Sequence, residues 1–142
     1  MKIASKTSFI DKLTNIFSPL LKFLFPDIKK DTEAHKEISM NIVANFLGLG
    51  NAATPLGLKA MKTMQKDNKK KDTLTDSMAM FIVINTASLQ IIPTTVIAIR
   101  SSLGSKNPTC IVFPVWIATL CAAVAGILVT KLFIKLSKKG KN

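Results

Sequence analysis

Three long uncharged runs alternate with lysine-rich segments along the chain. The runs cover residues 38–58, 77–99 and 107–130. About 20 consecutive uncharged, largely apolar residues suffice for a helix to cross the hydrocarbon core of a bilayer. The pattern therefore predicts an all-α, polytopic helical membrane protein rather than a soluble domain.

The first run is interrupted by residues that break a membrane helix. Between residues 48 and 57 it carries three glycines, a proline, an asparagine and a threonine. Glycine and proline weaken the helical hydrogen-bond ladder, and lipid offers no replacement partners. Broken backbone at membrane depth is tolerated where it packs in protein or lines a polar cavity, so this stretch is a candidate site. The predicted structural break consists of Gly48, Gly50, Pro55 and Gly57.

The second run is also interrupted, because it begins apolar and then turns polar before Pro93. Helical spacing places Thr86, Gln90 and Thr94 on one stripe, and Asn85 and Ser88 on a neighbouring one. A proline removes a backbone donor and frees a carbonyl in the preceding turn. Two interpretations stay open: these polar groups line a site, or they hold helices together by hydrogen bonds.

The third run carries small residues at every fourth position. Ala118, Ala122 and Gly126 form one face that allows close helix packing, within the chain or between chains. Lys131 then begins a basic tail that continues to residue 142.

An amphipathic pattern precedes the three runs, over residues 6–25. This segment is too charged to span a membrane, so it either lies on the membrane surface or packs against the other helices. We expect Pro26 to end it, Asp31 or Thr32 to cap the next helix, and Asp72 or Thr73 to start a later one. Its predicted apolar face consists of Phe9, Leu13, Ile16, Phe17, Leu20 and Leu24.

Charge separates this chain from soluble basic proteins. The formal net charge is +12, with 48% hydrophobic residues and a mean hydropathy of +0.32. The basic residues lie in blocks between the uncharged runs, which argues against nucleic-acid binding and favours a bilayer with anionic head groups. The length of 142 residues has room for one domain.

The same charges predict a topology. Residues 59–76 hold six lysines and the tail holds five, whereas the loop after the second run holds only Arg100 and Lys106. The positive-inside rule places the first two segments in the cytoplasm and that loop outside. Since residues 2–36 hold seven more lysines, we expect the first run to enter the membrane and return to the cytoplasmic side as a re-entrant segment.

Catalytic and metal-binding patterns are weak. Cys110 and Cys121 share no helical face, and His35 is the one histidine and lacks a second metal-type ligand nearby. No carboxylate pair or nucleophile–base spacing lies near either break. We therefore expect no enzyme activity, no metal site and no cofactor.

Several segments also resemble a known family. The run from Asn41 to Met61, NIVANFLGLGNAATPLGLKAM, closely resembles the signature of the spore maturation protein A family, within the nucleoside-recognition or Gate domain group. The segments NTASL at residues 85–89 and IPTTVI at 92–97 match a second block of that family. LFPD at residues 24–27 and GSKNP at 104–108 match as well.

This resemblance implies a multi-pass protein of the cell membrane, active in spore core dehydration and maturation. It implies a partner of the spore maturation protein B type and a small polar solute such as a nucleoside. The alternative is a structural subunit of a membrane complex that transports nothing. Family members usually begin with further hydrophobic helices, so we expect the N-terminal membrane helices to be missing here.

The predicted organisation has three parts. Residues 1–37 form an amphipathic helix and a polar connection, residues 38–130 a Gate-like membrane domain, and residues 131–142 a basic tail. The two interrupted segments are expected to meet near the bilayer midplane and to offer hydrogen bonds to a neutral polar solute. The candidate binding residues are Asn45, Asn51, Thr54, Asn85, Thr86, Ser88, Gln90 and Thr94, and Pro93 completes the predicted breaks.

Overall fold

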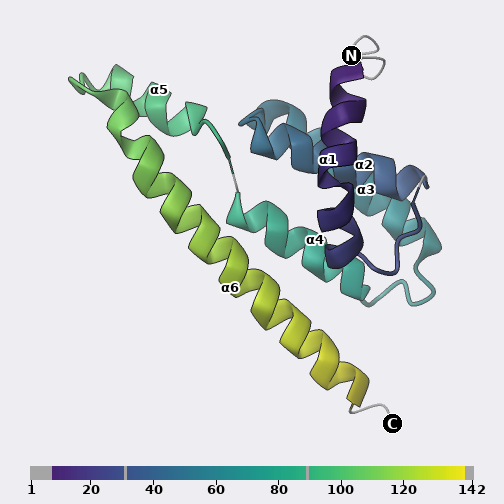
Figure 1. Ribbon diagram of the computed structural model, residues 1–142. Coiled ribbons are helices and arrows are strands. Elements are labelled where there is room, and N and C mark those ends of the chain that lie inside the picture. The colour runs from purple at the N-terminus through teal and green to yellow at the C-terminus, as the bar shows by residue number, and fades with distance from the viewer. Residues whose placement is uncertain (1–7, 31, 89, 140–142) are drawn as a thin grey trace.

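The computed structural model describes residues 8–30, 32–88 and 90–139, with the side chains of residues 8–15 outside the description. These ranges are helical and contain no strand, which confirms the all-α prediction. The helices are α1 (Ser8–Leu24), α2 (Glu33–Phe46), α3 (Gly50–Asp67), α4 (Asp76–Ala87), α5 (Thr94–Ser102), the short 3₁₀ helix η2 (Pro108–Ile111) and α6 (Val112–Lys139) (Figure 1).

Threonine side chains start two of these helices. The Thr32 hydroxyl accepts a hydrogen bond from the His35 backbone N–H at 3.2 Å, so it caps α2 as predicted. Thr75, not Asp72 or Thr73, caps α4 by the same contact to the Met78 N–H. The predicted start came too early because residues up to Thr73 belong to a turn, in which the Asn68 side-chain amide donates to the Thr73 carbonyl at 2.7 Å.

Helix α1 packs through a face that coincides only in part with the predicted one. Leu21 and Leu24 are buried with Phe25, and Phe17 lies against this core, whereas Ile16 and Leu20 are exposed. Phe9 and Leu13 lie outside the described side chains. The prediction was right for Phe17 and Leu24 and wrong for Ile16 and Leu20, because α1 has apolar residues on two sides and the packing buries only one of them.

The core lies where α1, α2, α3 and α4 meet (Figure 1). Its most deeply buried side chains include Leu21 of α1, Ile38 of α2, Ala60 of α3 and Met80 of α4. Each helix contributes one apolar stripe, which is the usual way in which helices bury their hydrophobic surface.

Helix α6 runs antiparallel to the segment from α4 to α5. Near the end of α6, Lys138 forms an ion pair of 3.1 Å with Asp76 at the start of α4. Before α6 begins, the thiol of Cys110 lies 3.3 Å from the Arg100 guanidinium in α5. The second and third runs therefore form the hairpin that the charge pattern predicts.

One face of α6 packs and the other is open. A Cβ atom at Gly126 would meet Val83 of α4 at 2.8 Å, so this glycine allows the two helices to approach closely. Ala118 and Ala122 of the predicted packing face are exposed. The open face carries large apolar side chains: Phe113, Ile117, Leu120, Val124, Leu128, Val129, Leu132, Phe133 and Leu136.

Candidate functional site

The two helix breaks meet, as the sequence predicts. The first break separates α2 from α3, and the second separates α4 from α5. Across them, the Ile91 N–H donates to the Phe46 carbonyl at 2.8 Å. The Thr94 hydroxyl donates to the Gly48 carbonyl at 3.2 Å. These bonds join segments more than forty residues apart in the sequence, so each break satisfies backbone groups of the other.

The first break is shorter than predicted and depends on one glycine. It covers residues 47–49, while Gly50 begins α3, and Pro55 and Gly57 lie inside that helix. Gly48 has φ +74°, and a Cβ there would lie 2.3 Å from the Ile92 carbonyl oxygen. Only glycine fits both the left-handed conformation and this close approach.

Gly57 allows close helix packing and does not interrupt α3. A Cβ at this position would meet the side-chain amide nitrogen of Asn41 at 3.0 Å. That nitrogen donates to the Ala53 carbonyl at 2.8 Å, which ties α2 to α3. The carbonyl of Ala53 lies in the turn before Gly57, so the small residue lets α3 approach the amide closely.

The second break includes Ser88 and residues 90–93, and Ser88 adopts a left-handed conformation with φ 47°. Pro93 lies in this connection, directly before α5, as predicted. The indole N–H of Trp116 in α6 donates to the freed Ile91 carbonyl at 2.7 Å. The second break is therefore held from two sides, by the first break and by α6.

An amide pair links the two interrupted segments. The Asn45 side chain in α2 donates to the Asn85 side-chain oxygen in α4 at 2.7 Å, and both residues are partly buried. The Asn85 amide nitrogen donates in turn to the Phe81 carbonyl at 2.8 Å. This arrangement brings together one predicted residue from each run, and their amides bind each other.

The other predicted binding residues divide into two groups. The hydroxyls of Thr54, Thr86 and Ser88 donate to carbonyls of their own segments, at 3.3, 2.9 and 3.1 Å. The amides of Asn51, which is exposed, and Gln90, which is half-buried, make no side-chain hydrogen bond within the described ranges. Asn51 and Gln90 are thus the predicted residues with amide groups available to a solute.

Asn41 and Trp116 were missed as site residues. Asn41 is 1% exposed, and its side-chain oxygen has no partner among the described residues. Its position four residues before Asn45 was the available signal, because residues at that spacing share a helical face. Nothing in the sequence connected Trp116 with Ile91, which lies 25 residues away.

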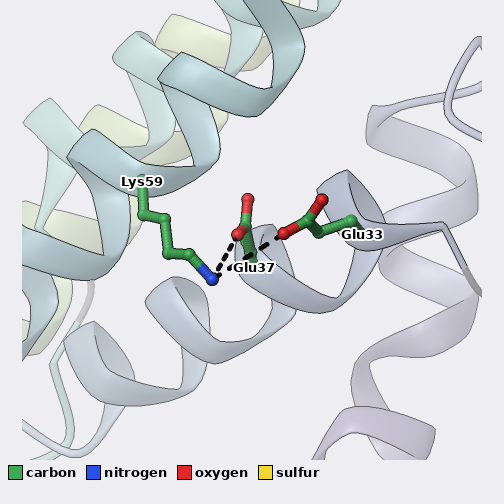
Figure 2. A network of polar contacts seen from close by, with 3 residues as sticks. All are labelled: Glu33, Glu37 and Lys59. Carbon is green, nitrogen blue, oxygen red and sulfur yellow. Dashed lines mark ion pairs between the residues drawn. The ribbon is translucent and has the colours of Figure 1, made fainter.

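A charged network links α2 and α3 at a distance from the first break, just outside the uncharged run (Figure 2). Lys59 lies 2.8 Å from Glu37 and 3.9 Å from Glu33. Burial of the Glu37 carboxylate disfavours its charged form, but the Lys59 ammonium and the Thr63 hydroxyl outweigh this effect and hold the pKa of Glu37 below its ordinary value. Within the described parts of the chain, no three His, Cys, Asp or Glu side chains gather as metal ligands would.

Comparisons with known proteins agree with these features. A model of the Gate family, described as nucleoside recognition, matches residues 1–106. Spore maturation protein A of Bacillus subtilis (strain 168) is 44% identical over 142 residues, which cover 99% of this chain and 72% of that protein. No solved structure matches the chain significantly.

Proposed function

The chain belongs to the Gate, or nucleoside recognition, family, and we propose that it is a multi-pass membrane protein that acts in spore maturation. The observation that carries the membrane location is the open face of α6. The helix from Pro108 to Lys139 is long and apolar enough to cross a bilayer, and its most apolar window is not buried in the protein. Exposing such an apolar face to water is unfavourable, whereas contact with lipid is not.

A second crossing is supplied by the segment from α4 to α5. It runs antiparallel to η2 and α6 and is uncharged from residue 77 to residue 99. The Ser88–Pro93 break would be costly in lipid, but the contacts to Phe46 and Trp116 satisfy backbone groups there.

The α2–α3 hairpin enters the membrane and returns to the basic side. Its tip lies at residues 47–49, and its charged residues Glu37 and Lys59 pair away from the tip. Helix α2 has 14 residues. At about 1.5 Å per residue this is about 21 Å, shorter than the roughly 30 Å hydrocarbon core. A re-entrant hairpin keeps the lysines of both flanking segments on the cytoplasmic side.

The membrane location is tested by extracting membranes of expressing cells with alkaline carbonate. We expect the chain to stay in the membrane pellet. Its release into the soluble fraction would overturn the proposal.

The crossing of the two breaks is the proposed site for a small, neutral, polar solute such as a nucleoside. The available amides of Asn51 and Gln90 support it, because amides both donate and accept hydrogen bonds. No charged residue lies in either run, so the role is binding or passage rather than catalysis or carboxylate-coupled ion transport. Titrating the purified chain with nucleosides by calorimetry tests this, with Asn51→Ala/Gln90→Ala as the variant that loses binding and Thr86→Ala as the control that keeps it.

A structural subunit is the second candidate. The Asn45–Asn85 pair favours it, because these two amides satisfy each other rather than a ligand. In that case the exposed Ala118 and Ala122 would pack against a partner of the spore maturation protein B type. Ala118→Leu/Ala122→Leu would then abolish co-purification with the partner, while Asn51→Ala/Gln90→Ala would leave it unchanged.

A further inference from the structure

A cavity of about 330 Å³ lies away from the helix breaks, where the end of α1, the start of α4 and the last turns of α6 meet. Its apolar side includes the buried Leu24 and Met80. Ser77 is the first residue of the second uncharged run, and Lys131 directly follows the third. In a membrane the cavity would therefore lie at the depth of the lipid head groups.

The charged side chains around this cavity favour a ligand with one negative charge. Lys131, Lys135 and Lys138 line it together with Asp27 and Asp76. Lys138 forms an ion pair of 3.1 Å with Asp76, so that this pair is neutral. Lys131 and Lys135 then face the single charge of Asp27, which leaves a net charge of +1, equal and opposite to one phosphodiester.

Ser77 provides an unused donor in the same cavity. Its side chain is buried, with 6% exposure, and its hydroxyl has no hydrogen-bond partner in the described part of the chain. Ser77 stands in the first turn of α4, where backbone N–H groups also favour an anion. A buried hydroxyl without a partner is costly, and a ligand oxygen would satisfy it.

Apolar surface continues from the cavity along two helices. On α1, Ile16, Leu20 and Phe23 share one face and are 68%, 44% and 61% exposed. On α6, Leu132 and Leu136 are exposed next to the lining lysines. The Lys131 ammonium lies 3.0 Å from the centroid of the Phe23 ring, so charged and apolar groups adjoin here.

From these features we propose that the cavity binds the head group of an anionic phospholipid. Lys131, Lys135 and the Ser77 hydroxyl bind the phosphodiester, Asp27 accepts a head-group hydroxyl, and the acyl chains lie along the exposed apolar faces of α1 and α6. The proposal rests on the membrane location proposed above. The exposed face of α1 then contacts lipid, while the opposite face packs on the core.

Native mass spectrometry of the full chain in neutral detergent tests this. Phosphatidylglycerol and phosphatidylcholine of matched acyl chains are titrated against the wild type, Lys131→Gln/Lys135→Gln and Lys69→Gln/Lys70→Gln. The last variant removes the same charge from the exposed loop after α3. We expect the wild type to prefer phosphatidylglycerol, and the first variant to lose about 30-fold in that affinity, from two lysines near an anionic surface. The loop variant should bind like the wild type.

Three outcomes would overturn the proposal: equal affinity for both lipids, equal losses in the two double variants, or displacement of phosphatidylglycerol by soluble glycerol phosphate. Lys135→Gln alone provides a milder variant, because Lys135 is exposed and its loss should not disturb folding. Carbonate extraction is performed on every variant. A chain that stays in the membrane without preferring the anionic lipid rejects this site alone, whereas a soluble chain rejects the membrane location too.

Discussion

The two helix breaks both interrupt uncharged runs but have opposite effects on the path of the chain. At the first break, three residues around a left-handed Gly48 turn the chain back, so that α2 and α3 pack as a hairpin. At the second, the connection that ends in Pro93 lets the chain continue, so that α4 and α5 follow one another along α6 and η2. A helix break in an uncharged run therefore does not by itself say whether the chain crosses or returns. The local backbone and the neighbouring helix decide.

Removing the glycine of the first break gives the largest expected effect. Gly48→Ala places a Cβ in a left-handed conformation and against the Ile92 carbonyl. We expect a loss of about 3 kcal/mol in the free energy of unfolding, from backbone strain and overpacking together. Denaturation by SDS in mixed micelles measures it.

Gly50→Ala is the matched control, since Gly50 is helical and a Cβ there meets nothing within 4 Å. Its stability should equal or slightly exceed that of the wild type. Equal losses for both variants would contradict the special role of Gly48.

The second break should respond to Trp116, whose indole N–H binds it directly. Trp116→Phe keeps the ring but removes the donor to the Ile91 carbonyl. We expect a loss of about 1 kcal/mol from the missing hydrogen bond, measured by the same unfolding assay through circular dichroism. Ile117→Leu, on the open face, should have almost no effect. If Ile117→Leu lost as much stability as Trp116→Phe, the loss in Trp116→Phe could not be assigned to the indole hydrogen bond.

The amide pair that links the breaks should give a smaller, coupled effect. In a double-mutant cycle of Asn45→Ala and Asn85→Ala, we expect a coupling free energy of about 0.6 kcal/mol, the average for such bonds between membrane helices. Pairing Asn51→Ala with Asn85→Ala should give none. Additive effects of Asn45→Ala and Asn85→Ala would show that the two breaks are independent.

The smallest effect concerns the charged end of the α2–α3 hairpin. Since the pKa of Glu37 is lowered in the folded protein, its stabilising contribution is complete above the ordinary value of 4.5 and is lost as pH falls through the folded value. We expect Glu37→Gln to remove this part of the acid sensitivity, and the effect is small because Lys59 is exposed and solvent screens the pair. Glu33→Gln should keep it, and identical pH profiles for the wild type and Glu37→Gln would contradict the assignment.

Much of this organisation follows from local sequence signals. The cap at Thr32, the interruption of the first two uncharged runs and the hairpin of the second and third runs were predicted from residue types and spacing. The exact break was not, because Pro55 and Gly57 are compatible with a helix whose partner supplies the packing. The buried face of α1 was predicted only in part, since apolar residues occupy two of its sides and only tertiary contacts choose between them.

The candidate site was likewise predicted only in part. Spacing placed Asn85 on one stripe with Ser88, and the structure joins Asn85 to Asn45 of the other run. It could not show that Thr54, Thr86 and Ser88 satisfy themselves with nearby carbonyls, because that depends on the side-chain rotamer.

Cysteine accessibility in intact cells tests most directly whether one break returns the chain and the other lets it cross. In a chain with Cys110→Ser and Cys121→Ser, single cysteines are placed by Lys30→Cys, Lys70→Cys and Ser105→Cys. A membrane-impermeant thiol reagent should label only residue 105 from outside, because residues 30 and 70 flank the returning break and residue 105 follows the crossing one. Labelling of residue 30 from outside would contradict the re-entrant hairpin, and protection of residue 105 would contradict the second crossing.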